Sequence, residues 1–76
     1  MSQEDEFKGA GAALRQLREA QGKSQEDIAF EVGFDQSSYS KVERLGPQVV
    51  SWAKLMKIAG ALGCSIQITF KPRSGG

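Results

Sequence analysis

Residues 24–44 read SQEDIAFEVGFDQSSYSKVER, and the rest of the chain is best interpreted outward from them. The stretch is typical of two short helices joined by a tight turn at Gly33, because glycine readily adopts the positive φ that such a turn requires. Ser24 and Asp27 match a capping box at the start of the first helix, with Asp in place of the usual Glu. The second helix carries small and polar side chains where a core helix would carry leucines. We expect it to enter a polar groove, and the DNA major groove is the leading candidate.

The spacing within this stretch fits two closely packed helices. With Gln25 counted as the first position, a small residue falls at the fifth, where the helices approach each other, and glycine falls at the ninth. Asp35 is a good N-cap for a helix from Gln36 to about Leu45. The residues expected to face the core are Ile28, Ala29, Val32, Phe34, Tyr39 and Val42. The residues expected on the outer side of the second helix are Gln36, Ser37, Ser40, Lys41 and Arg44.

Two further helices are predicted on either side of this pair. Apolar residues at helical spacing, with Leu14 and Leu17 among them, predict a helix from about Gly9 to Gln21. A second apolar pattern predicts a helix from residue 50 or 51 to Leu62. Its inner face is expected to comprise Trp52, Leu55, Met56, Ala59 and Leu62, with Ile58 beside it. Between the helices, Gly46 and Pro47 break the pattern, and residues 47–50 have room for a short extra turn.

The end of the chain changes from helical spacing to alternation. Ile66, Ile68 and Phe70 alternate with polar residues, which predicts a β-strand. A single strand cannot pair its own backbone groups, and no other stretch reads as a strand. The simplest solution is a two-stranded ribbon formed with a second copy of the chain across a two-fold axis. The alternative is an extended tail that packs as coil or pairs with the N-terminal segment.

These patterns predict a mainly α-helical fold and a simple division of the chain. We expect a flexible leader at 1–8, a helical DNA-binding domain at 9–63, a dimerisation strand at 64–71 and a tail at 72–76. The fold class is a compact bundle of four to five helices followed by a short C-terminal β-strand.

Composition excludes several classes of protein. The 76 residues carry a net charge of +1, no histidine and one cysteine, so a disulfide within one chain is excluded and a metal site is not expected. Cys64 is interpreted as a small packed hydrophobe. No membrane span or signal peptide is visible, which favours a cytoplasmic location. Gly9 and Gly11 do not form a nucleotide fingerprint, and no catalytic motif or cofactor site is recognisable, so we do not expect an enzyme.

At this point the sequence resembles the Cro/cI-type helix-turn-helix family, also described as Xre-like or lambda-repressor-like. The resemblance rests on residues 24–44 and continues through LRQLREAQG at 14–22 and LMKIAGALG at 55–63. It covers about residues 9–63 and implies a compact bundle of four or five helices that binds double-stranded DNA. The chain departs from the usual pattern at Tyr39, at Phe30 and in the position of Gly46.

The resemblance also implies roles for individual residues. Family members often pair an arginine of the first helix with a glutamate late in the third, which here means Arg18 and Glu43. Gln25 is expected to brace Gln36 and to touch a phosphate. Glutamine pairs with adenine, whereas lysine and arginine reach guanine or phosphate. Ser24, Lys23 and the start of the second helix are expected to hold the DNA backbone. The alternative for each polar residue is a solvated helix position without a partner.

Three functions fit these residues. The first is a dimeric transcriptional repressor that reads a palindromic operator with residues 36–45. The second is an antitoxin that represses its own operon and binds a toxin, because residues 61–70 resemble the ending of Hip-type antitoxins. The third is a protein-interaction module that keeps the fold without binding DNA, for which the near-neutral charge is the main support.

Overall fold

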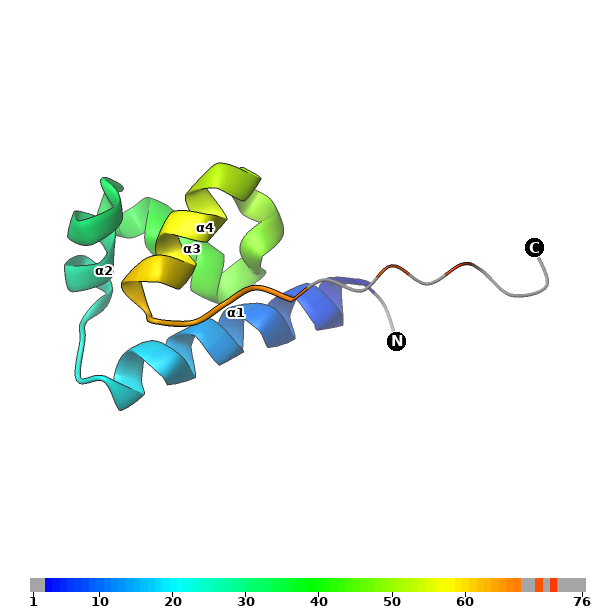
Figure 1. The fold of residues 1–76 in the computed structure, drawn as a ribbon, viewed down its shortest axis with the longest axis horizontal. Coiled ribbons are helices and arrows are strands. Elements are labelled where there is room, and N and C mark those ends of the chain that lie inside the picture. Colours follow the sequence, from blue (N-terminus) through cyan, green and yellow to red (C-terminus); the bar gives the residue numbers. More distant parts are fainter. Residues whose placement is uncertain (1–2, 68–69, 71, 73–76) are drawn as a thin grey trace.

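Four α-helices and one 3-10 helix make up the regular structure of the residues that the computed structural model describes, which are 3–67, 70 and 72. The helices are α1 (Gln3–Ala20), α2 (Gln25–Val32), α3 (Gln36–Leu45), η1 (Pro47–Val49) and α4 (Trp52–Ala61). Figure 1 shows α1 along one side of the molecule, with the other helices gathered against it. The predicted mainly α-helical bundle is confirmed, and η1 occupies the position of the predicted extra turn.

Local sequence signals define the pair α2 and α3. The Ser24 hydroxyl accepts a hydrogen bond from the backbone N–H of Asp27 at 3.0 Å, and the Asp27 carboxylate accepts one from the backbone N–H of Ser24 at 2.9 Å. This reciprocal capping box confirms the predicted start of α2. Gly33 ends α2 with φ of 77°, and the N–H of Phe34 then donates to the carbonyl of Ala29 at 2.8 Å. The turn therefore has the glycine-dependent geometry that the sequence predicts.

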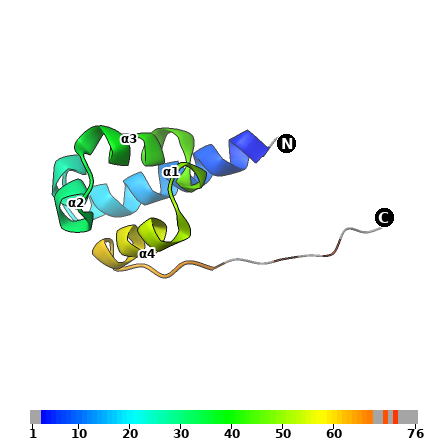
Figure 2. The same cartoon turned by 90° about the horizontal axis from the view of Figure 1, so that it is seen from above.

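The core lies between α2, α3 and α4. Helix α2 packs on both α3 and α4, and α1 packs on α3; Figure 2 shows α1 and α3 side by side. The buried apolar residues are Ile28, Ala29, Val32, Tyr39, Val42, Ile58, Ala59 and Leu62. The predicted inner faces of α2 and α3 are therefore confirmed, with Phe34 partly buried against them. The core is completed by side chains from elements far apart in sequence, so α2 and α3 depend on α4 for their apolar cover.

Helix α1 differs from its prediction in where it begins and in which residues it buries. It begins at Gln3, not at Gly9, so most of the expected leader is helical. Acidic Asp5 and Glu6 lie near this start, where negative charge interacts favourably with the helix dipole. Where burial is described in α1, at residues 5–20, the buried residues are Gly11 and Arg18, whereas Leu17 is 38% exposed. The face of α1 that is closed off from solvent thus includes an arginine.

Helix α4 also exposes side chains that were expected inside. It ends at Ala61, and its buried residues are Ile58 and Ala59, followed by Leu62 at the cap. Trp52 is 52% exposed and Met56 is 56% exposed, so their predicted place on the inner face is wrong for this single chain. The physical reason is that α4 packs against α2. A single neighbouring helix covers only part of the apolar surface of α4.

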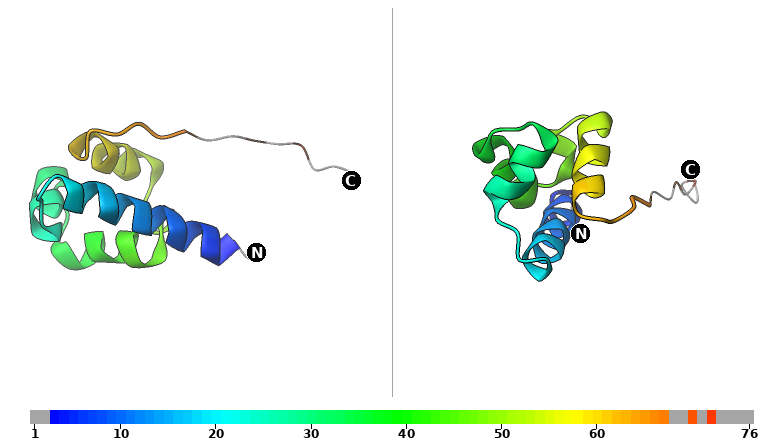
Figure 3. Two further views of the ribbon diagram at one scale, coloured as in Figure 1. Left: turned by 90° about the horizontal axis from the view of Figure 1, so that it is seen from below. Right: turned by 60° about the vertical axis from the view of Figure 1, so that its left-hand side comes forward.

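The segment after α4 contains no strand among its described residues, which are 62–67, 70 and 72. Figure 3 shows this segment following α4 on the outside of the bundle. Ile66 is half-buried and Phe70 is exposed, while Ile68 lies outside the described residues. The strand therefore stays a prediction.

Asp35 occupies the predicted N-cap position of α3 but makes no side-chain capping bond. Its carboxylate instead accepts hydrogen bonds from the hydroxyls of Ser37 at 3.4 Å and Ser38 at 3.2 Å.

Two glycines of α1 provide a matched test of how closely α1 approaches α3. A Cβ atom at Gly11 would lie 2.7 Å from the carbonyl oxygen of Val42, and closer still to that of Glu43, whereas a Cβ at Gly9 would meet no atom within 4 Å. We expect Gly11→Ala to lower the free energy of unfolding by about 1–3 kcal/mol through overpacking. Gly9→Ala should raise it by roughly 0.5–1 kcal/mol because alanine favours the helix. Urea denaturation of both variants checks this, and equal effects would contradict the close approach.

Candidate nucleic-acid interface

Helix α3 presents a polar side to solvent because its other side is anchored in the core. Tyr39, Val42 and Glu43 are buried, and they lie three and four positions apart on one face of the helix. The residues expected to contact DNA are more open to solvent. Gln36, Ser37, Lys41 and Arg44 are exposed, and Ser40 is half-buried. Packing against the bundle thus determines which side chains of α3 a partner can reach.

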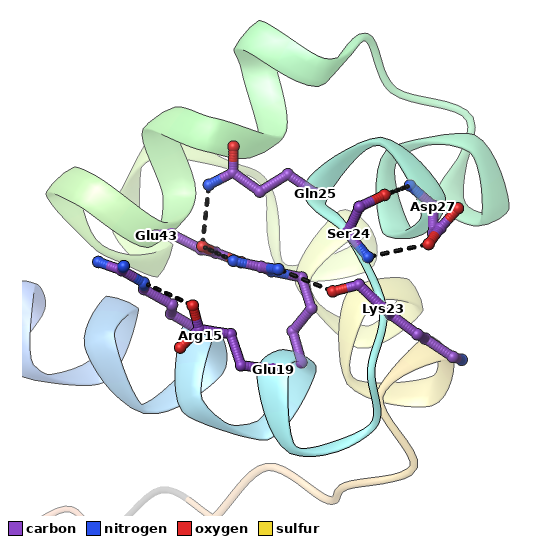
Figure 4. A network of polar contacts seen from close by, with 8 residues as sticks. Arg15, Glu19, Lys23, Ser24, Gln25, Asp27 and Glu43 are labelled. Carbon is purple, nitrogen blue, oxygen red and sulfur yellow. Dashed lines mark hydrogen bonds and ion pairs between the residues drawn. The ribbon is translucent and has the colours of Figure 1, made fainter.

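A buried ion pair joins α1 to α3. Arg18 and Glu43 are 8% and 7% exposed. The Nε of Arg18 donates to Oε2 of Glu43 at 2.7 Å, and Nη2 donates to Oε1 at 3.1 Å, which is the two-pronged geometry that best satisfies a carboxylate. The third donor, Nη1, bonds to the backbone carbonyl of Lys23 at 2.8 Å. The guanidinium therefore holds α1, the loop before α2 and α3 in one arrangement, as Figure 4 shows.

Gln25 extends this network to the start of α2. Its side-chain nitrogen donates to Oε1 of Glu43 at 2.9 Å. We expected Gln25 to brace Gln36. In the structure, the Gln25 amide instead bonds to the buried carboxylate of Glu43. Ser24 caps α2 beside it and is exposed. The start of α2 is thus tied to the buried face of α3 through Glu43.

The protonation of the network follows from its contacts. Burial alone would raise the pKa of Glu43, but hydrogen bonds from Arg18 and Gln25 help to outweigh it and hold the pKa below its usual value. The hydrogen bond to Glu43 raises the pKa of Arg18. Both groups are therefore charged at neutral pH.

Tyr39 stands beside this pair and carries an unusual hydroxyl. Its side chain is fully buried, and burial raises its pKa. Its hydroxyl lies beside the Glu43 carboxylate, and the interaction with that negative charge raises the pKa of the tyrosine further. Tyr39, where the sequence departs from the usual pattern, therefore lies next to the ion pair.

Lys23 is separated from the other expected DNA contacts. Its ammonium group bonds to the carbonyl oxygen of Ala61 at 3.2 Å and lies 3.4 Å from a carboxylate oxygen of Glu31. These contacts direct the side chain toward the end of α4 and away from the exposed side of α3. Only the backbone carbonyl of Lys23 takes part in the Arg18 network.

One hollow brings together residues from three helices and includes an arginine that sequence reasoning missed. It has a volume of about 440 Å³ and is lined by Arg15, Arg18, Gln25, Ser40, Glu43 and Arg44. Five of these were among the predicted site residues, whereas the sequence analysis assigned no role to Arg15. Its spacing of three from Arg18 was the available signal, because residues three apart lie on the same face of a helix.

The described residues contain no group of three metal-ligating side chains and no helix of sufficient length and apolar character to cross a membrane.

Comparison with known proteins gives one match. A helix-turn-helix family model matches residues 14–68, which is more than half of the chain. The chain belongs to the Cro/cI-type helix-turn-helix family. Helix-turn-helix proteins of this family are DNA-binding regulators and not typically enzymes, so the polar side of α3 belongs to a DNA-binding domain. No curated protein and no solved structure matches the chain.

We expect Glu43→Gln to destabilise this helix-turn-helix domain in a pH-dependent way. It leaves the Arg18 charge buried without its carboxylate, which costs about 3–5 kcal/mol in comparable pairs. Since the pKa of Glu43 is lowered in the folded protein, its stabilising contribution is present above the ordinary glutamate pKa and is lost as pH falls through the folded value. Urea denaturation should show a large difference from wild type at pH 7 that narrows in acid.

Asp27→Asn is the matched control, because this exposed carboxylate also has a lowered pKa, caused first by its hydrogen bond from the Ser24 backbone. The control should lose less stability than Glu43→Gln. Unchanged stability and DNA binding in Glu43→Gln would contradict a structural role for the pair.

Proposed function

We propose that this chain is a dimeric transcriptional repressor that reads a palindromic operator with α3. The observation that carries the proposal is the division of α3 into a buried face and an exposed polar face. The N-terminal residues of a recognition helix meet base edges, and here these are Gln36 and Ser37. The buried pair of Arg18 and Glu43 keeps α3 rigid relative to α1 and α2, so its side chains enter the groove already oriented.

The exposed side of α3 offers two kinds of contact. Gln36 supplies the amide that pairs bidentately with adenine, and Lys41 and Arg44 supply charges for guanine or phosphate. Ser24 and the start of α2 add backbone contacts, which orient the protein but carry no sequence information. A chain with a near-neutral net charge can bind DNA in this way because its charges are unevenly distributed. In α3 the cationic Lys41 and Arg44 are exposed, whereas the acidic Glu43 is buried.

An apolar surface on α4 supports a second copy of the chain as partner. Trp52 and Met56 lie one helical turn apart and are both more than half exposed. Together with Cys64 and Ile66 they line a hollow of about 360 Å³ beside the segment that leads to the predicted strand. Contiguous exposed apolar side chains of this kind commonly mark a protein contact. A ribbon formed by two such segments would bring these surfaces from both copies to the two-fold axis.

Gln36→Ala and Lys41→Ala should separate base reading from backbone contact. First, operators are selected from a random DNA pool, and we expect a palindrome with half-sites roughly 34 Å apart. On that operator, Gln36→Ala should cost about 1–3 kcal/mol and relax preference at one base position per half-site. Lys41→Ala should weaken binding to all sequences and reduce the salt dependence. A uniform loss in Gln36→Ala would make Gln36 a positioning contact, and no salt-sensitive binding at all would favour a protein-interaction module.

Ile68→Asp should disrupt the dimer, whereas Gln67→Asp should not. The predicted strand places these neighbouring residues on opposite faces, so only the first puts a charge on the apolar face. Molar mass measured by light scattering at micromolar concentration checks the difference, with circular dichroism to show that both variants retain their helices. A wild-type chain that is already monomeric there would exclude the ribbon.

A further inference from the structure

The hollow between α1, the start of α2 and α3 has a charge arrangement that suits an anion. Its buried part contains Arg18 and Glu43, which neutralise each other. Its exposed rim carries Arg15 from α1 and Arg44 from α3, and both side chains are open to solvent. Ser40 adds a hydroxyl to the lining. The unbalanced charge of the hollow is therefore positive and lies at the rim.

Arg15 is held by a weak intramolecular partner. Its Nε lies 3.3 Å from a carboxylate oxygen of Glu19, one helical turn along α1, and the two side chains are 62% and 53% exposed. Exposed pairs of this spacing contribute little to stability. Figure 4 shows Arg15 and Glu19 joined by this contact on α1. Arg44 forms no salt bridge with any described residue. Both rim arginines are thus available to a ligand at small cost.

We propose that Arg15 and Arg44 clamp one phosphate of the operator backbone, and that Glu19 is an internal competitor which Arg15 leaves when DNA binds. The proposal rests on the DNA-reading function proposed above and adds to it a contact from α1 and an acidic residue that weakens binding. The site adjoins the exposed side of α3 through Ser40 and Arg44, so DNA placed on that side brings its backbone across the hollow.

A phosphate is the ligand that fits best. Guanidinium groups bind the two free oxygens of a phosphate with paired hydrogen bonds, and two arginines from different helices can hold it from both sides. Arg15 lies on α1 and outside the helix-turn-helix pair, so its contact positions the protein without reading bases. Glu19 carries a negative charge next to Arg15, which opposes the phosphate until Arg15 changes partner.

The test is a salt series on the selected operator with Arg15→Gln, Glu19→Gln and the double variant. Lys57→Gln is the control, because it removes one exposed charge from α4, which does not line the hollow. We expect Arg15→Gln to weaken binding roughly 10-fold, the scale of a hydrogen bond to a charged group. For this variant, the slope of log affinity against log salt concentration should become shallower by about one per protomer, and the base preference should not change.

The competitor is tested by the second variant. Glu19→Gln should bind a few-fold more tightly, and this gain should disappear in the Arg15→Gln background because the two side chains act as one unit. The clamp is overturned if Arg15→Gln behaves like Lys57→Gln, or if it changes the preferred bases. The competitor is overturned if the gain from Glu19→Gln persists without Arg15. If the wild type binds no DNA selectively, the proposed function fails and the clamp fails with it, whereas failure of the clamp alone leaves Gln36-dependent binding intact.

Discussion

The buried pair of Arg18 and Glu43 is the interaction on which the other polar contacts depend. Its geometry uses both carboxylate oxygens and all three guanidinium nitrogens, and it connects α1, the loop before α2, the start of α2 and α3. Burying two charges is costly unless the pair has good geometry and further hydrogen bonds. Here the pair is two-pronged, Arg18 also bonds to the carbonyl of Lys23, and Glu43 also accepts from Gln25, so the network ties α3 to α1 and to the start of α2. A recognition helix held in this way reaches DNA with little conformational entropy left to lose.

The same pair explains why the site divides into a rigid part and an adaptable part. Gln25 is bound to Glu43, and Tyr39 is packed beside it, so the side chains nearest the core have defined positions. Farther out, Gln36, Lys41 and Arg44 are exposed and can adjust to bases or phosphates. The helix-turn-helix domain thus combines a fixed backbone with mobile ends of long side chains. In the proposed exchange, Arg15 leaves Glu19 for a phosphate. This exposed pair lies at the border between the rigid part and the adaptable part of the site.

Several large apolar side chains are exposed among the described residues. Trp52 and Met56 of α4 are both more than half exposed, Phe30 of α2 is 86% exposed and Phe70 is 91% exposed. A domain of this size buries a limited share of its surface and gains stability from association. A palindromic operator needs two recognition helices related by a two-fold axis. The exposed apolar surface and the proposed reading of a palindrome therefore point to the same partner, a second copy of the chain.

Local patterns in the sequence were sufficient for α2, the turn at Gly33 and the buried face of α3, because capping, positive φ and helical spacing act over a few residues. The resemblance to the Cro/cI-type family also supplied the pairing of Arg18 with Glu43. Periodicity could not predict which strip of each helix its neighbours cover. That strip depends on how the helices pack, and it places Gly11 and Arg18 of α1 inside while leaving Trp52 and Met56 outside. Packing also brings Arg15 to the rim of the hollow beside Ser40 and Arg44, since those residues are distant in sequence and meet only in the folded bundle.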